Sequence, residues 1–165
     1  MVEFSKLLSG TVSGKVLEHF LQNPSQKISA AQLERKIKIA KKTVLDALKK
    51  YSFLLEREKI GNSILYSLDL NNPVSRQLKI LFSICSLSGE VPKDFDGQGF
   101  LFGSAARGED TEKSDWDVLV ISSERISFKN PKVKPVFFTP LEYSALARKD
   151  TAFFNSIEKN KIKVF

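Results

Sequence analysis

The spacing of apolar positions predicts a run of three helices in the first part of the chain. Apolar residues recur on one side of residues 12–22, as in an amphipathic helix that covers a core. Residues 29–37 form a second helix, because Ser29 and Gln32 have the spacing of a capping box. The third helix, residues 41–51, turns apolar side chains inward and leaves mostly lysines outside. The pattern therefore predicts a helical unit with one basic face.

Strand-like runs follow these helices. Residues 53–60 and 63–70 flank the dipeptide Gly61-Asn62, which is typical of a two-residue hairpin turn. An Asn-Pro pair then starts a helix over residues 72–86, whose broad apolar stripe predicts burial on more than one side. This helix packs between two domains or forms a dimer contact, and the sequence leaves both open. The side chains expected in these contacts are Val74, Leu78, Ile80, Leu81, Phe82, Ile84 and Cys85.

The remaining part of the chain mixes strands with helices. Residues 100–102 and 116–121 have the pattern of buried strands, and Gly103-Ser104 turns the first of them into a short helix. Residues 132–139 are expected to form a third strand. Apolar positions further on predict two helices, and residues 162–165 an edge strand.

Two carboxylates at the start of the second strand are the first candidates for chemistry. Residues two apart on a strand point to the same side, so Asp115 and Asp117 present their carboxylates together while Trp116 turns inward. Oxygen ligands of this kind suit magnesium, which shares its coordination with substrate phosphates. Upstream, Gly103 lets a phosphate approach the backbone, and Ser104 with the amides of the helix start supplies donors. These features predict a site for a metal nucleoside triphosphate.

The stretches Gly103-Ser104-x-Ala106-Arg107-Gly108 and Ser114-Asp115-Trp116-Asp117-Val118 carry a resemblance. They look like the signature of the minimal nucleotidyltransferases of the DNA polymerase β superfamily. The resemblance implies transfer of a nucleoside monophosphate from an NTP, with ATP expected, to an acceptor such as a protein hydroxyl. It also implies a small helical HEPN-type protein as partner.

The resemblance also implies a role for individual residues. Asp115 and Asp117 would be the catalytic pair and would hold Mg²⁺ or Mn²⁺. Ser104, helped by Arg107, would hold the β and γ phosphates of the nucleotide. Arg107 has a second interpretation, as an exposed helical arginine in a surface ion pair. The partners open to it in that case are Glu109 and Asp110.

One departure from the family pattern leaves the activity open. Active members normally carry a third carboxylate on a later strand, whereas residues 132–139 contain no acid and place Lys134 near that position. An ammonium neutralises carboxylates or contacts phosphate, but it does not ligate magnesium. The alternative to an enzyme is therefore an inactive DNA-binding regulator or antitoxin-like module that binds only nucleotide or a protein partner. The later acids are Glu142, which has the setting of a helix start, Asp150 and Glu158.

The first part of the chain resembles a different class of domain. Three helices followed by a hairpin have the order of a winged helix, and residues 43–68 are similar to the winged-helix domains of prokaryotic regulators. This resemblance implies DNA binding and transcription regulation. Exposed lysines also serve solvation alone, and winged helices also bind proteins. The candidates for contact with DNA phosphates are Lys41, Lys42, Thr43, Lys49, Arg57 and Lys59.

The expected fold class is therefore α+β. An N-terminal winged helix-turn-helix (residues 1–71) is joined by a linker helix (residues 72–88) to a small mixed-sheet nucleotidyltransferase-like domain (residues 89–165). The chain has a net charge of +7, and residues 1–70 carry most of the excess. The sequence also leaves open a homodimer that forms through the linker helix.

The composition adds a few exclusions. Cys85 is the single cysteine, which excludes an intramolecular disulfide and suits the reducing cytoplasm. His19 is the single histidine and has no second ligand near it, so a metal site built on imidazole is not expected. No segment approaches the roughly twenty apolar residues that a membrane helix needs.

Overall fold

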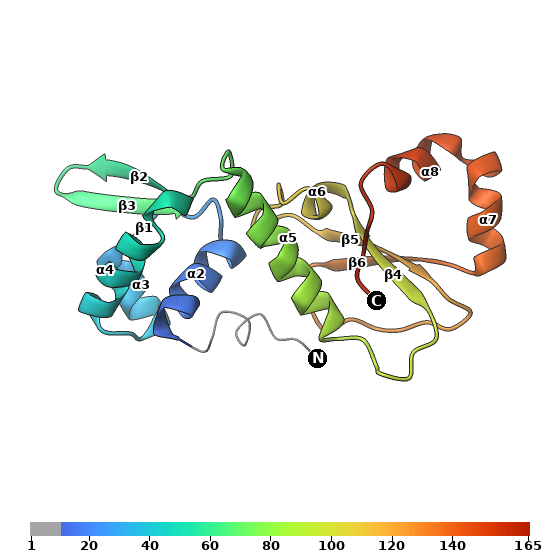
Figure 1. The fold of residues 1–165 in the computed structure, drawn as a ribbon, viewed down its shortest axis with the longest axis horizontal. Helices are drawn as coiled ribbons and strands as arrows, with labels where there is room; N and C mark the ends of the chain where they lie inside the picture. Colours follow the sequence, from blue (N-terminus) through green and yellow to red (C-terminus); the bar gives the residue numbers. More distant parts are fainter. Residues whose placement is uncertain (1–10) are drawn as a thin grey trace.

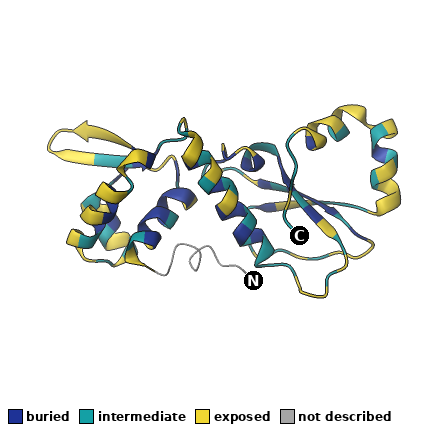
Figure 2. Cartoon of the chain, in the orientation of Figure 1, coloured by how far each residue is buried: buried dark blue, intermediate teal, exposed yellow. Residues whose placement is uncertain are grey.

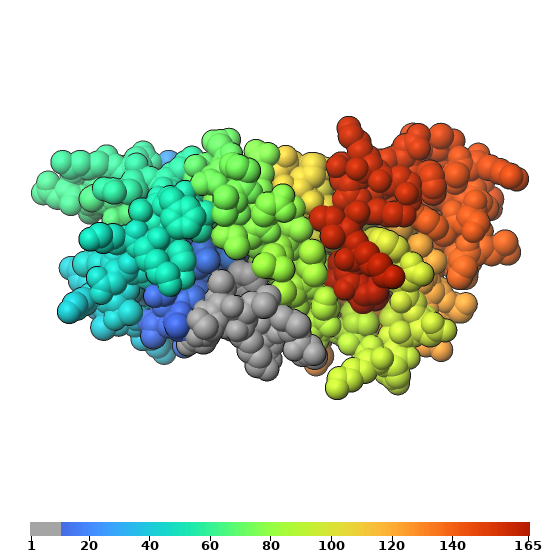
Figure 3. All heavy atoms as spheres, viewed as in Figure 1, coloured from blue at the N-terminus to red at the C-terminus, as the bar shows by residue number. Residues whose placement is uncertain are grey.

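The structure is a computed structural model of the 165-residue chain and describes residues 11–165. The N-terminal helices lie on one side of α5, and a sheet that includes β4, β5 and β6 lies on the other side (Figure 1). In the space-filling view, the atoms of α5 likewise separate the two ends (Figure 3). The elements in chain order are α2 (Val12–Gln22), β1 (Ile28–Ser29), α3 (Ala30–Ile37), α4 (Lys41–Lys50), the 3-10 helix η1 (Ser52–Leu54), β2 (Leu55–Ile60), β3 (Ser63–Leu68), α5 (Pro73–Ser88), β4 (Gln98–Phe102), α6 (Gly103–Ala106), β5 (Trp116–Ile121), β6 (Val133–Phe138), α7 (Pro140–Lys149), α8 (Thr151–Glu158) and β7 (Ile162–Lys163).

The predicted order of three helices and a hairpin is present at the N-terminal end. The capping box of α3 is confirmed: the Ser29 hydroxyl accepts from the Gln32 amide, and the Gln32 side chain accepts from the Ser29 amide. Gly61 stands in the turn between β2 and β3 with a φ of 56°. The sequence pattern does not predict β1, which pairs with β3 and brings Ile28 into the core. The result is a small sheet in the order β1-β3-β2.

The larger sheet has the order β6-β5-β4-β7. β5 runs parallel to β6 and antiparallel to β4, and β7 is the predicted edge strand. Side chains alternate along β5: Val118 belongs to the buried cluster that includes α5, whereas Leu119 packs with Leu146 of α7 and Ile157 of α8. The sheet is therefore covered on both faces, which explains the continuous apolar run of β5.

Helix α5 begins at the predicted Asn-Pro pair, but the buried face expected for it is partly wrong. Val74 and Leu81 are 48% and 41% exposed, whereas Lys79 is only 2% exposed. Figure 2 shows exposed and buried positions alternating along this helix. The reason is a polar contact: Lys79 is buried against an aspartate, Asp110, at 3.1 Å. Lysine is almost never fully buried unless it is paired, so the apolar pattern does not indicate it.

Packing between the two ends is the role that the structure shows for α5. One cluster of buried residues includes Phe20 of α2, Phe82 of α5 and Val118 of β5, so the core is continuous across the helix. Cys85 lies in this cluster, as expected, and burial raises the pKa of its thiol. The domain boundaries and the dimer contact stay predictions, and the first ten residues of the predicted domain 1–71 lie outside the described part. Within residues 11–165, no helix combines the length and apolar character needed to cross a membrane.

His19 on α2 is a buried histidine with one modest polar neighbour. The side chain is 6% exposed, and its Nδ1 lies 3.5 Å from Asn23 Nδ2. Burial, and secondarily the charge of Lys36, lowers its pKa from 6.5 to about 4. In the part of the chain that the structure describes, no group of three or more His, Cys, Asp or Glu residues could hold a metal ion.

We predict that His19 makes the fold sensitive to mild acid. Its folded-state pKa of about 4 lies below the unfolded value of 6.5, so the unfolded chain takes up the proton first as the pH falls. The free energy of unfolding should therefore fall between pH 6.5 and 4, by about 1 to 3 kcal/mol. Urea unfolding of the wild type and of His19→Gln across this range tests it. The variant should lose less stability than the wild type, and parallel profiles would contradict the prediction.

Candidate functional site

The turn that joins β4 to α6 lies against the start of β5. Phe102 is the register partner of Asp117 in the antiparallel pair of β4 and β5, so the following residue, Gly103, lies beside the Asp117 side chain. A Cβ at Gly103 would stand 2.7 Å from Asp117 Oδ2. Gly103 also has a φ of 72°, a conformation that residues other than glycine rarely adopt. Glycine is thus required here by backbone conformation and by the closeness of the carboxylate.

Ser104 follows this turn and is half-buried. Its carbonyl oxygen accepts the amide hydrogens of Arg107 and Glu109, which closes the short helix α6. No hydrogen bond joins its hydroxyl to any other of residues 11–165. A half-buried hydroxyl without an internal partner is free to bond a ligand, as the predicted phosphate contact requires.

The carboxylates of Asp115 and Asp117 lie close enough to affect each other. Burial, and secondarily the charge of Asp115, raises the pKa of Asp117. Trp116 between them is buried, as the predicted alternation requires. Among residues 11–165, no Lys, Arg or His forms a salt bridge with either carboxylate. Two neighbouring carboxylates of this kind fit a magnesium site. Magnesium takes one or two carboxylates and completes its coordination shell with waters and phosphate oxygens.

The neighbouring strand supplies a lysine where the family pattern has a third carboxylate. Lys134 of β6 is the register partner of Asp117 in the parallel pair of β5 and β6, so the prediction that it lies near this position is confirmed. Its side chain is exposed. The later acids are engaged elsewhere: Glu142 completes the capping box of α7, Asp150 caps α8, and Glu158 bonds Tyr143 and Lys161.

Arg107 is bound within its own turn. Its Nε donates to Glu109 Oε2 at 2.7 Å, and its guanidinium also donates to the carbonyl oxygen of Gly103 at 3.0 Å. Of the two interpretations left open, the ion pair with Glu109 is the one that the structure shows. The alternative partner, Asp110, is wrong because it is buried with Lys79. An exposed ion pair of this kind is weak, so Arg107 remains able to exchange partners.

The candidate DNA contacts lie on two neighbouring elements. Lys41, Lys42 and Lys49 are exposed on α4, and Thr43 is half-buried. Arg57 and Lys59 are exposed on β2, where they alternate with Glu56 and Glu58. A small cavity of about 180 Å³ is lined by Lys49, Arg57 and Tyr66 among others, so α4 and the hairpin meet at these side chains.

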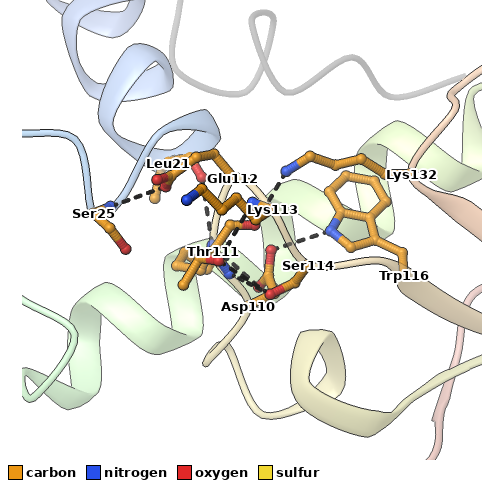
Figure 4. Close-up of polar contacts among 10 residues, drawn as sticks. Leu21, Ser25, Asp110, Thr111, Glu112, Lys113, Ser114, Trp116 and Lys132 are labelled. Carbon is orange, nitrogen blue, oxygen red and sulfur yellow. Dashed lines mark hydrogen bonds and ion pairs between the residues drawn. The ribbon is translucent and has the colours of Figure 1, made fainter.

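A buried polar network near the site is one that sequence reasoning missed. Asp110, in the connection between α6 and β5, is 2% exposed and contacts Lys79 and the Trp116 indole. The close-up shows Asp110 below Trp116, with Thr111 and Ser114 beside it (Figure 4). A lone lysine in the apolar stripe of residues 73–88 is the signal that could have found it, because such a lysine requires a buried partner.

The comparisons with known proteins bear on this half of the chain. A family model described as "Nucleotidyltransferase domain" matches residues 84–163. This match supports a nucleotidyltransferase domain over the segment that holds the Gly103–Ser104 turn and both aspartates. Neither the comparison with curated proteins nor the comparison with solved structures gave a match. The helices α2 to α4, the hairpin and Lys79 lie outside the matched segment.

We predict that Gly103→Ala disturbs the site more than its conformation alone would. Gly61 is a matched control, because it also has a positive φ but a Cβ placed on it would have no atom within 4 Å. Gly61→Ala should cost about 1 kcal/mol of stability from the backbone alone. Gly103→Ala should lose a similar amount of stability, because the one atom that its Cβ would meet is an oxygen at the end of the rotatable Asp117 side chain. It should instead weaken Mn²⁺ binding, because the Asp117 carboxylate has to turn away. Urea unfolding measures the stabilities and a Mn²⁺ titration measures the binding. A Gly103→Ala variant that binds Mn²⁺ as tightly as Gly61→Ala does would show that Asp117 does not lie against Gly103.

Proposed function

We propose that the chain is a nucleotidyltransferase that moves a nucleoside monophosphate from an NTP to an acceptor hydroxyl. The observation that carries the proposal is the contact between Gly103 and Asp117, because it joins the turn expected to bind phosphate to the carboxylates expected to bind metal. The family match over residues 84–163 supports the same class of activity. ATP is the expected nucleotide, and a protein hydroxyl is the expected acceptor.

Each residue of the site has a role in this proposal. Gly103 leaves space for the Asp117 carboxylate beside the turn, and the Ser104 hydroxyl donates to the β or γ phosphate. Asp115 and Asp117 hold Mg²⁺ or Mn²⁺. The ion, when bound, stabilises negative charge that develops on the attacking and leaving oxygens. The bond between the acceptor oxygen and the α phosphorus forms as the bond to pyrophosphate breaks, and the proton of the acceptor hydroxyl passes to water.

A second candidate function is nucleotide binding without turnover. The observation that favours it is Lys134, which occupies the position beside Asp117 on the neighbouring strand. An ammonium there contacts a phosphate but does not ligate metal. In this case the chain is a DNA-binding regulator or antitoxin-like module, and a HEPN-type protein is the expected partner.

We predict nucleotide-dependent chemistry that requires Asp117. With Mg²⁺ or Mn²⁺ and each labelled NTP in turn, the wild type should release pyrophosphate or label itself or an added acceptor. Asp117→Asn should reduce the rate about 100-fold or more, because the site loses a metal ligand. Asp94→Asn, the same change at an exposed loop position, should leave the rate unchanged.

A stability control and a measurement of nucleotide binding complete the test of the candidate functions. Without metal, Asp117→Asn should be at least as stable as the wild type, because the raised pKa of Asp117 shows that the fold disfavours its ionised form. If no product forms but magnesium nucleotide protects the wild type against thermal unfolding, the second function holds. If neither product nor protection is seen, both functions are wrong.

We also propose that the N-terminal end is a winged helix that binds DNA. The support is the order of α2, α3, α4 and the β2–β3 hairpin, together with the exposed lysines of α4. Lys49 and Arg57 line one cavity, so α4 and the wing present their cations side by side. Contacts of this kind go to phosphates and fix position rather than sequence.

We predict that the lysines of α4 carry the affinity for DNA. Changing Lys41, Lys42 and Lys49 together to Gln should lower the slope of log K against log salt by about 0.9 for each phosphate that the variant no longer binds. The control variant changes Lys149, Lys159 and Lys163 together to Gln. It removes the same charge from exposed positions in the C-terminal part of the chain. Fluorescence anisotropy with duplex DNA over a salt series compares the two variants. If the slope decreases equally in the two variants, net charge alone, rather than the exposed face of α4, accounts for DNA binding.

A further inference from the structure

The connection between α6 and β5, residues 108–115, carries Asp115 and leads directly into Asp117; we refer to it as the 108–115 loop. Its centre is the buried Asp110. Asp110 Oδ2 accepts a hydrogen bond from Trp116 Nε1 at 3.1 Å, and Oδ1 lies 3.1 Å from Lys79 Nζ. Trp116 stands between the two candidate metal ligands in the chain. A contact that fixes the indole therefore also fixes the side to which Asp115 and Asp117 point.

Lys79 connects this loop to the N-terminal end of the molecule. Its ammonium lies 3.5 Å from the carbonyl oxygen of Leu21, in the last turn of α2, as well as beside Asp110. Burial lowers the pKa of Lys79, although Asp110 acts in the opposite direction. Burying such a pair gives little net stability compared with apolar side chains of the same shape. Its specific contribution is geometric, because one ammonium holds α2, α5 and the loop together.

Other contacts of the loop also come from outside the larger sheet. A Cβ at Gly108 would stand 2.3 Å from the carbonyl oxygen of Arg76, so the loop lies directly on the backbone of α5. Glu112 Oε2 accepts the amide hydrogen of Ser25, in the turn that follows α2, at 3.3 Å (Figure 4). The carboxylate pair is therefore positioned by two segments, α2 with its following turn and the first half of α5, that precede the matched residues 84–163.

We propose that Lys79 is a positioning residue of the nucleotide site: through Asp110 and Trp116 it sets the direction of the two aspartates. This inference rests on the proposed function, since it assigns Lys79 to the same site. Lys79 touches neither metal nor nucleotide in this role. The N-terminal end is then a structural part of the site as well as a candidate DNA-binding unit.

The test compares the binding of Mn²⁺ and ATP to full-length variants. The fluorescence of Trp116, the single tryptophan, reports the binding. Lys79→Met keeps the length of the side chain and removes its charge. The double variant Lys79→Met/Asp110→Asn also removes the buried charge left behind and keeps an acceptor for Trp116, so it should fold even if the single variant does not. Both should bind MnATP about 10- to 100-fold more weakly than the wild type. Losses of this size are typical when a residue that orients the metal ligands is changed.

Ile157→Ala controls for lost stability. Ile157 is fully buried in the second cluster, against α7 and the opposite face of the sheet, and that cluster contains no residue of the loop. Its truncation should destabilise the fold as strongly as a large core deletion does. At a temperature where every variant is folded, it should leave the affinity for MnATP within about twofold of the wild type. An affinity for MnATP that is unchanged in the double variant would overturn the inference.

Hydrogen exchange separates a failure of the inference from a failure of the proposed function. If the wild type itself binds no MnATP, the proposed function is wrong. The exchange rates of the backbone amide hydrogens of the loop then test whether Lys79 holds it in place. Residues 108–115 should then exchange about tenfold faster or more in the double variant than in Ile157→Ala, measured by mass spectrometry. Equal exchange in these two variants would show that Lys79 does not hold the loop.

Discussion

The buried contact of Lys79 with Asp110 is the constraint on which the arrangement of this protein depends. Both residues are 2% exposed, so neither charge has water to replace its partner. Breaking such a pair from one side leaves an uncompensated buried charge, which costs about 3 to 5 kcal/mol. Because Lys79 also contacts the carbonyl of Leu21 and Asp110 also binds the Trp116 indole, the pair joins α2, α5 and β5 in one geometry.

The candidate site presents the opposite electrostatic situation a few residues away. No Lys, Arg or His among residues 11–165 forms a salt bridge with Asp115 or Asp117, and burial together with the charge of Asp115 raises the pKa of Asp117. A divalent ion bound between the two carboxylates, as proposed, would offset this repulsion. Gly103 adds the second half of the site, because only a residue without a side chain leaves the Asp117 carboxylate its place. In the proposed arrangement, the ion pair of Lys79 and Asp110 positions Asp115 and Asp117.

Much of this structure could be predicted from the sequence because its signals are local. The capping box of α3, the Gly61 turn, the helix start at Glu142 and the alternation around Trp116 each depend on neighbouring residues, and each is present as expected. The pairing of β4 with β5 then brings Gly103 beside Asp117, as expected for one site.

The features that sequence reasoning missed depend on distant partners. Strand β1 is only two residues long and exists because β3 lies beside it. The exposed Val74 and the buried Lys79 depart from the expected pattern of α5, because Lys79 is buried against the distant Asp110. The sequence leaves Arg107 open between phosphate and a surface pair, and only the geometry of the Gly103 turn shows its contact with Glu109.

The most direct measurement of the central claim is a crystal structure of the protein with Mn²⁺ and a non-hydrolysable ATP analogue, with the metal located by its anomalous scattering. We expect one manganese peak bonded to carboxylate oxygens of both Asp115 and Asp117, at about 2.0 to 2.3 Å, with the triphosphate on the Ser104 hydroxyl. A bound nucleotide whose metal lies away from both aspartates, or whose triphosphate lies away from the Gly103–Ser104 turn, would contradict the account.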